Sequence, residues 1–205
     1  MKRLRTIDVS ALPAGNVSYQ HPLWWGQLFL AFTEGSVFCI LLGMYLYIRL
    51  SVDVWPPPGI QLPHRLLPGA ATLLLVFSCA GTWLASEAAK ADDRFGVIWG
   101  LLLNLVLAIA AMAVRTVEWW SWNYTWRTTA YGSINWSILF LHTVDVVADL
   151  AFTLVLILIF ILGKHGPKQR IGVHVDSIVW YFLVLIWIPL YTAVYWGPYI
   201  TGGAG

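Results

Sequence analysis

Apolar residues along this chain are grouped into five long blocks, separated by short polar or helix-breaking stretches. A helix needs about 20 mostly apolar residues to cross a hydrocarbon layer of about 30 Å. Each block is long enough to do so, whereas a transmembrane barrel would show alternating segments of about ten residues. The pattern therefore predicts an all-α protein, a bundle of five transmembrane helices. The predicted spans are 23–50, 68–90, 95–120, 131–163 and 177–199.

The segments outside these spans predict short tails and loops, with no separate soluble domain. Residues 1–22 start with a basic cluster but lack the apolar core of a cleaved signal peptide, so we interpret them as a polar tail. Residues 23–199 form the predicted membrane domain, and residues 200–205 form a short C-terminal tail. In the last span Pro189 predicts a kink, and Asp176 just before that span predicts an N-cap. Small residues of the second span permit close approach of a helix or lipid; they are Gly69, Ala70, Ala71, Ala80 and Gly81.

Five spans place the termini on opposite sides of the membrane, and the basic residues indicate the orientation. Of the 12 Lys and Arg residues, eight fall on the side of the N-terminus and four on the other. Because cytoplasmic loops are enriched in Lys and Arg, we expect a cytoplasmic N-terminus, in a bacterial-type plasma membrane. Tryptophans cluster at both membrane interfaces, as this orientation predicts. They are Trp24, Trp25, Trp99 and Trp180 on the inner side, and Trp55, Trp119, Trp120, Trp122, Trp126 and Trp196 on the outer side.

The composition agrees with a membrane protein and excludes several other classes. Charged residues make up 11% of the 205 residues, against about 25% in soluble domains, and the mean hydropathy is +0.71. The net charge of +2 is too small for a nucleic-acid partner, because phosphate binding needs a basic face. Cys39 and Cys79 lie inside apolar blocks, so we interpret them as small buried hydrophobic residues.

Ionisable residues inside the spans are the candidates for function, because a charge in the bilayer core is costly. Glu34 lies about 11 residues, or roughly 16 Å, into the first span. In the fourth span His142, Asp145 and Asp149 are three and four residues apart, which places them on one helical face. These four residues are candidates for a proton relay or an ion site. The alternative is that they are buried structural groups satisfied by hydrogen bonds within the bundle.

The remaining chemistry of the sequence is structural. Arg115 and Glu118, three residues apart near the outer end of the third span, predict an ion pair. A helical bundle that binds two metal ions needs a Glu-x-x-His motif on each of two helices, which this sequence lacks. It also lacks a cluster of soft ligands that would suit copper. Only His142 among the five His lies well inside a span, so haem ligation is not expected. With no nucleophile–base set, phosphate loop or dinucleotide fingerprint, we predict no catalytic, cofactor-binding or metal-binding residue.

Several motifs, in order, resemble subunit III of the cytochrome c oxidases, the haem–copper oxidase family. Residues 55–60, Trp-Pro-Pro-Pro-Gly-Ile, resemble the family's W-P-P-x-G-I loop, and Glu34 matches its intramembrane glutamate. The resemblance runs from about Gly26 to Trp196 and corresponds to the last five helices of the seven-helix form. Further matches are Val117-Glu118-Trp119, Tyr131-Gly132-Ser133 followed by His142, and the closing Trp187, Tyr191, Tyr195 and Trp196.

Two departures from the family pattern indicate a diverged member. Asp145 stands where the family has the second His of H-G-x-H. Tyr181 and Val184 stand where the last helix of the family has the His and Asp of W-H-F-V-D. Asp145 and Asp149 are candidates to replace this lost polarity from another helix.

The resemblance implies an accessory, redox-inactive subunit of a respiratory terminal oxidase. Haem and copper are then expected in the partner subunits, and no cofactor in this chain. In the family, subunit III packs against the catalytic subunit I (with subunit II in the same complex), binds phospholipid, and supports proton uptake, turnover stability and assembly. The implied partners are these subunits and membrane lipids. Alternatives are an accessory protein of a nitric oxide reductase, an independent membrane transporter or ion-binding protein, and a metal- or haem-bearing membrane enzyme.

Overall fold

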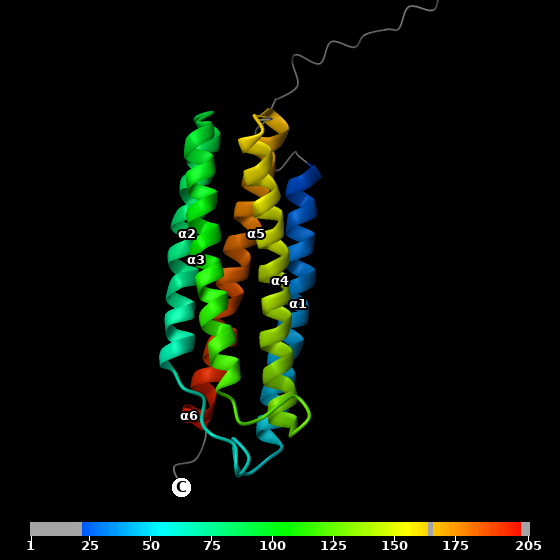
Figure 1. Cartoon of the computed structure of the whole chain (residues 1–205). Helices are drawn as coiled ribbons and strands as arrows, with labels where there is room; N and C mark the ends of the chain where they lie inside the picture. Colours follow the sequence, from blue (N-terminus) through cyan, green and yellow to red (C-terminus); the bar gives the residue numbers. More distant parts are fainter. Residues whose placement is uncertain (1–21, 164–165, 202–205) are drawn as a thin grey trace, which may run out of the picture.

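The computed structural model describes residues 22–163 and 166–201, and this part of the chain is helical with no strand. Five segments are long and apolar enough to cross a membrane, so the chain is an integral membrane protein. This result confirms the predicted all-α class and the five-helix bundle (Figure 1). The predicted tail at 1–22 lies almost wholly outside the described residues. The helices are α1 (Pro22–Leu50), α2 (Leu66–Lys90), α3 (Arg94–Trp120), α4 (Ala130–Ile161) and α5 (Pro167–Tyr191), then the π-helical segment η1 (Thr192–Trp196) and α6 (Gly197–Thr201).

The long helices alternate in direction, so the connections gather at the two ends of the bundle (Figure 1). The longer loops, residues 51–65 and 121–129, lie with α6 at what we call the loop end. There Asn123 Nδ2 donates to the carbonyl of Gly59 at 2.9 Å, and the amide of Gln61 donates to Asn123 Oδ1 at 3.3 Å. These bonds join the two loops. The α2–α3 connection and the start of α5 lie at the opposite, or turn, end.

Local hydrogen bonds explain where α3 begins and where α4 begins and ends. The Asp93 side chain accepts from the amide of Phe95 at 3.0 Å and so caps the start of α3. Thr129 caps α4 in the same way. The Arg94 guanidinium donates to the carbonyls of Phe160 and Ile161, at 2.8 and 2.7 Å. A cation suits the free carbonyls of a helix C-terminus, so Arg94 ties the start of α3 to the end of α4.

The most extensive helix contact, between α2 and α3, depends on glycine. A Cβ placed on Gly81 would lie 2.6 Å from the amide nitrogen of Asn104, and one on Gly100 would collide with the backbone of Ala85. The backbones can approach this closely only without side chains at these positions. The close approach predicted for the small residues of the second span is therefore confirmed at Gly81.

The first helix is the least buried of the five. In its most apolar stretch 11% of the residues are buried, against 33–39% in the other four spans. Only Phe38 and Tyr45 of α1 are buried, and they pack into the main core. Cys39, which we expected to be buried, is exposed on α1, and Cys79 is half-buried. Most of the apolar surface of α1 therefore faces outward.

Two of the tryptophans predicted to lie at the membrane interfaces are buried among the core side chains. Trp55 is 4% exposed, and its indole N–H donates to the Tyr45 hydroxyl at 3.2 Å. Trp180 is 0% exposed, and its N–H donates to Ser78 Oγ at 2.9 Å. Each indole can be buried because its N–H finds a partner inside the bundle.

The last long helix starts earlier than its apolar stretch predicts. α5 begins at Pro167, and proline suits the first turn of a helix because its missing N–H would be unbonded there anyway. Asp176 therefore lies in the third turn of α5, and its assignment as an N-cap is wrong. Beyond Pro189, which cannot donate a backbone hydrogen bond, the helix changes to the π form at Thr192.

Candidate functional site

A cleft of about 250 Å³ between α1, α4 and α5 brings together three of the four candidate residues. Glu34 of α1 and Asp145 and Asp149 of α4 all line it. Glu34 and Asp145 are half-buried, whereas Asp149 is 7% exposed. We call this space the acidic cleft. Its three carboxyls share one opening within the membrane-spanning part of the bundle.

A fourth carboxyl, that of Asp176, lies behind the acidic cleft. Asp176 is 0% exposed, and its Oδ1 accepts from the Thr153 hydroxyl at 2.9 Å. Thr153 is one helical turn from Asp149 on α4, so Asp176 of α5 faces the stretch of α4 that carries Asp149. The Oδ2 atoms of Asp149 and Asp176 are buried and accept no hydrogen bond. Sequence reasoning missed this pair because the polar residues before Asp176 concealed the true start of α5.

His142, about two turns before Asp149 on α4, is bonded through both ring nitrogens to other helices. Its Nε2–H donates to the carbonyl of Leu183 at 3.1 Å, and its Nδ1 accepts from Arg115 Nη1 at 3.2 Å. A carbonyl can only accept and a guanidinium can only donate. The bonding pattern therefore assigns a neutral imidazole with its hydrogen on Nε2, and both nitrogens are occupied by the protein.

Arg115 and Glu118 do not form the direct ion pair that their spacing predicts. Both residues are 1% exposed, but the salt bridges in the described part of the chain involve other residues. Arg115 donates instead to Thr143 Oγ1 at 3.0 Å and to His142, and its guanidinium lies 4.0 Å from the centroid of the Trp187 ring. Partners on α4 and α5 therefore take the place of Glu118, whose carboxylate oxygens are buried.

At the loop end a chain of aromatic rings holds the Trp-Pro-Pro-Pro-Gly-Ile loop to the bundle. Ring centroids are 5.3 Å apart for Tyr45 and Trp55, 4.7 Å for Trp55 and Tyr131, and 5.4 Å for Tyr131 and Tyr124. These are edge-to-face contacts, a favourable arrangement of aromatic pairs. Burial raises the pKa of the Tyr124 hydroxyl, which keeps it protonated. The role of this motif is therefore structural.

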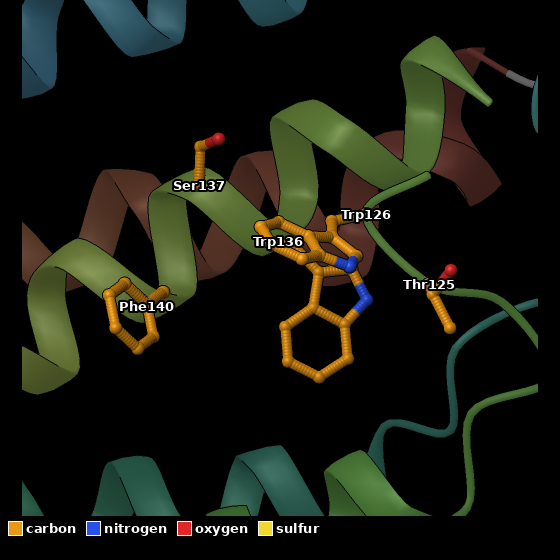
Figure 2. A pocket seen from close by; sticks show the side chains of 5 residues that line it. All are labelled: Thr125, Trp126, Trp136, Ser137 and Phe140. Carbon is orange, nitrogen blue, oxygen red and sulfur yellow. The ribbon is translucent and has the colours of Figure 1, made fainter. Parts of the chain in front are cut away.

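A second hollow, of about 580 Å³, lies at the loop end beside α4 and has aromatic walls. Figure 2 shows Trp136 and Phe140, one helical turn apart, on the same side of α4, with Trp126 contributed by the preceding loop. Thr125 and Ser137 complete the lining, which contains no ionisable residue. Walls of this kind suit an apolar chain better than a charged substrate.

The histidines of α4 and α5 lie within hydrogen-bonding distance of other protein groups. His174, which sequence reasoning placed outside the spans, lies in α5, and its Nδ1 is 2.9 Å from Ser86 Oγ of α2. His142 is bonded at both nitrogens, as described above. Among the described residues, no group of three or more His, Cys, Asp or Glu is placed to hold a metal ion.

Several known proteins similar to this chain share one name. The protein called cytochrome c oxidase subunit 3 from Triticum aestivum is 26% identical over 144 residues, which cover 70% of this chain and 54% of the relative. The protein of that name from Synechocystis sp. is 24% identical over 176 residues, covering 83% and 74%. The one from Thermostichus vulcanus is 24% identical over 186 residues, covering 87% and 90%.

The extent of the match differs between relatives but includes most of this chain. The chain spans about half the length of the relatives from Triticum aestivum, Rhizopus stolonifer and Arabidopsis thaliana. A family model described as cytochrome c oxidase subunit III matches residues 13–199, which include all five long helices. The resemblance seen in the motifs between Gly26 and Trp196 is thereby confirmed, and the chain belongs to the cytochrome c oxidase subunit III family.

Proposed function

We propose that this chain is an accessory, redox-inactive subunit of a respiratory haem–copper terminal oxidase. The observation that carries the proposal is the family match over residues 13–199, in a five-helix membrane bundle. In this proposal haem and copper are held by subunits I and II, and this chain packs against subunit I. The complex resides in a bacterial-type plasma membrane with the N-terminus of this chain on the cytoplasmic side.

The bonding of the two helix-borne histidines supports a redox-inactive role. Haem or copper would need imidazole nitrogens that are not already bonded to the protein. Arg115 and Leu183 occupy both nitrogens of His142, and Ser86 engages one nitrogen of His174. Recruiting His142 as a ligand would take from the buried guanidinium of Arg115 one of its two acceptors, which is costly.

Two apolar surfaces support the proposed contacts with subunit I and with lipid. Phe29, Phe32 and Ile40, which share one face of α1, are 64%, 74% and 65% exposed. We assign this face to subunit I, because α1 buries so little of its surface within the chain. The aromatic hollow beside Trp136 is assigned to a phospholipid acyl chain, since its lining lacks ionisable groups.

The acidic cleft supports the proposed contribution to proton uptake. Glu34, Asp145 and Asp149 place three groups that can carry a proton in one opening within the spans. Ionisable groups at such depth are commonly parts of proton or ion pathways. The same cleft is also the observation that favours an independent ion-binding protein or transporter as the second candidate.

The proposal is tested by purifying the chain from its native membrane in a gentle detergent through an affinity tag. Optical spectra and metal analysis are recorded for the complex and for the chain after its partners are stripped. Haem and copper should accompany the complex and be absent from the stripped chain. A chain that purifies alone, or that keeps haem or metal by itself, contradicts the accessory role. A complex that consumes nitric oxide but not oxygen assigns the chain to a nitric oxide reductase instead.

A further inference from the structure

Asp149 and Asp176 form a pair of buried carboxyls on neighbouring helices with unused acceptor atoms. Asp149 lines the acidic cleft at 7% exposure, and Asp176 lies behind it at 0% exposure. Thr153, one turn from Asp149 on α4, donates to Asp176 Oδ1 at 2.9 Å. The Oδ2 atom of each aspartate is buried and accepts no hydrogen bond from the protein. Two acceptors of this kind in one place call for a ligand that supplies positive charge.

The charges around this pair are negative. The charged side chains that act on Asp149 are Asp176 and Glu34, and the one that acts on Glu34 is Asp145. If all four carboxyls were ionised they would carry four negative charges within the membrane-spanning part of the bundle. Such a cluster is unstable in a medium of low dielectric constant unless positive charge is bound to it.

Basic side chains of the surrounding helices do not supply this charge. Arg115 of α3 donates to His142 and Thr143, and the neutral His142 of α4 donates to the Leu183 carbonyl. His174 of α5 is engaged with Ser86 of α2. Within residues 22–163 and 166–201, no salt bridge involves any of the four carboxyls. The positive charge must therefore come from outside the protein.

We propose that Asp149 and Asp176, with the Thr153 hydroxyl, bind one exchangeable monovalent cation, either a proton or a sodium ion. This assignment goes beyond the accessory role and does not depend on which complex the chain serves. The pair offers only oxygen atoms, which suits hard cations and not the metals that prefer nitrogen or sulfur. Two carboxyls and a hydroxyl provide at most five oxygen atoms, fewer than the roughly six to eight that Ca²⁺ takes.

The acidic cleft gives the cation a route to the pair. Glu34 and Asp145 are half-buried at its opening, and Gln27 of α1 also lines it, with an unbonded Oε1 atom. Half-buried carboxyls can be solvated through the opening, whereas the buried pair cannot. Glu34 and Asp145 would therefore attract a cation, and Asp149 and Asp176 would hold it.

The test uses the full chain in the complex from which it is purified, and compares Asp149→Asn, Asp176→Asn and Asp53→Asn. Asparagine is close in shape to aspartate and removes the charge, so both pair variants are expected to fold. Asp53 is exposed in the loop of residues 51–65 and serves as the control. Binding of ²²Na⁺ is measured by equilibrium dialysis, with N-methylglucamine chloride holding the ionic strength constant. Infrared spectra without sodium follow the carbonyl stretch of protonated carboxyls as the pH changes.

A sodium site predicts saturable binding of one ²²Na⁺ per chain, weakened about tenfold or more by either pair substitution because each removes one attracting charge. A proton site predicts no such sodium binding, but one carboxylic acid band that titrates with pH and disappears in both pair variants. Asp53→Asn should leave either result unchanged.

Three results would overturn the proposal. The first is that neither saturable sodium binding nor a titrating acid band is found. The second is that the response persists in Asp149→Asn or in Asp176→Asn. The third is that both acids stay protonated over the whole pH range, since the site would then exchange nothing. If a pair variant does not fold, the unsubstituted protein still tests the proposal through its unfolding temperature. A sodium site requires this temperature to rise with sodium at constant ionic strength, and a proton site requires it to rise with falling pH in the absence of sodium.

Discussion

Arg115 is a charged side chain placed fully inside the bundle, and its partners explain how it is accommodated. It donates to His142 and Thr143 on α4 and lies over the ring of Trp187 on α5. A buried cation is tolerated when its donors meet acceptors; here Nη1 meets two acceptors, whereas Nη2 is buried without a partner. The i, i+3 spacing favoured Glu118 as the partner, but helix spacing reports only neighbours on the same helix. The acceptors on other helices are set by packing.

Replacing His142 by Phe should destabilise the protein by about 2 kcal/mol, because the buried guanidinium of Arg115 and the Leu183 carbonyl each lose one hydrogen bond. Phenylalanine keeps a ring in the same space, so the change is mainly polar. The measurement is the free energy of thermal or denaturant unfolding of the purified chain in detergent. Thr116→Val, at an exposed position of α3, is the control and should change the stability little. Equal stabilities of His142→Phe and the control would contradict the assigned role of His142.

At the scale of helices, the contact between α2 and α3 is the most extensive of the bundle. It depends on Gly81 and Gly100, where any Cβ would collide with the backbone of the facing helix. The small residues of the second span predicted a close approach, but not which of them makes it. Ala70 and Ala80 turn out to be exposed, because the facing helix covers only the side of α2 that carries Gly81.

Gly81→Ala should destabilise the bundle by about 1–3 kcal/mol, since the added methyl group forces the two backbones apart. Gly43→Ala is the matched control, because a Cβ at Gly43 of α1 meets nothing within 4 Å. Alanine also favours the helix over glycine by about 1 kcal/mol, so this control should be neutral or slightly stabilising. Unfolding temperatures of the two variants, measured side by side in detergent, should therefore differ in sign or clearly in size. A loss in Gly43→Ala as large as that in Gly81→Ala would show that the contact is not responsible.

For the whole molecule, the alternation of five spans places the loop end and the turn end on opposite sides of the membrane. The excess of Lys and Arg on the N-terminal side predicts that the turn end is cytoplasmic. This orientation matters for the proposed cation site, because it determines the side of the membrane from which a cation would enter the acidic cleft.

Cysteine labelling tests this orientation. In a background with Cys39 and Cys79 replaced by alanine, Asp53→Cys reports on the loop end and Ala91→Cys on the turn end, since both positions are exposed. A membrane-impermeant maleimide added to intact cells or right-side-out vesicles should label Asp53→Cys at once, and Ala91→Cys only after permeabilisation. The reverse pattern would invert the orientation, and labelling of both from one side would contradict five spans.

The sequence by itself determined the five-helix class, a close approach by the small residues of the second span and, through short motifs, the family. These depend on the length of apolar stretches and on neighbours along the chain, which a linear pattern contains. Only the tertiary structure decided that Trp55 and Trp180 are buried, that Arg115 bonds to His142, and that the buried Asp176 lies close to Asp149, which lines the acidic cleft. Each of these depends on which side chains from distant segments meet, and packing between helices settles that for the molecule as a whole.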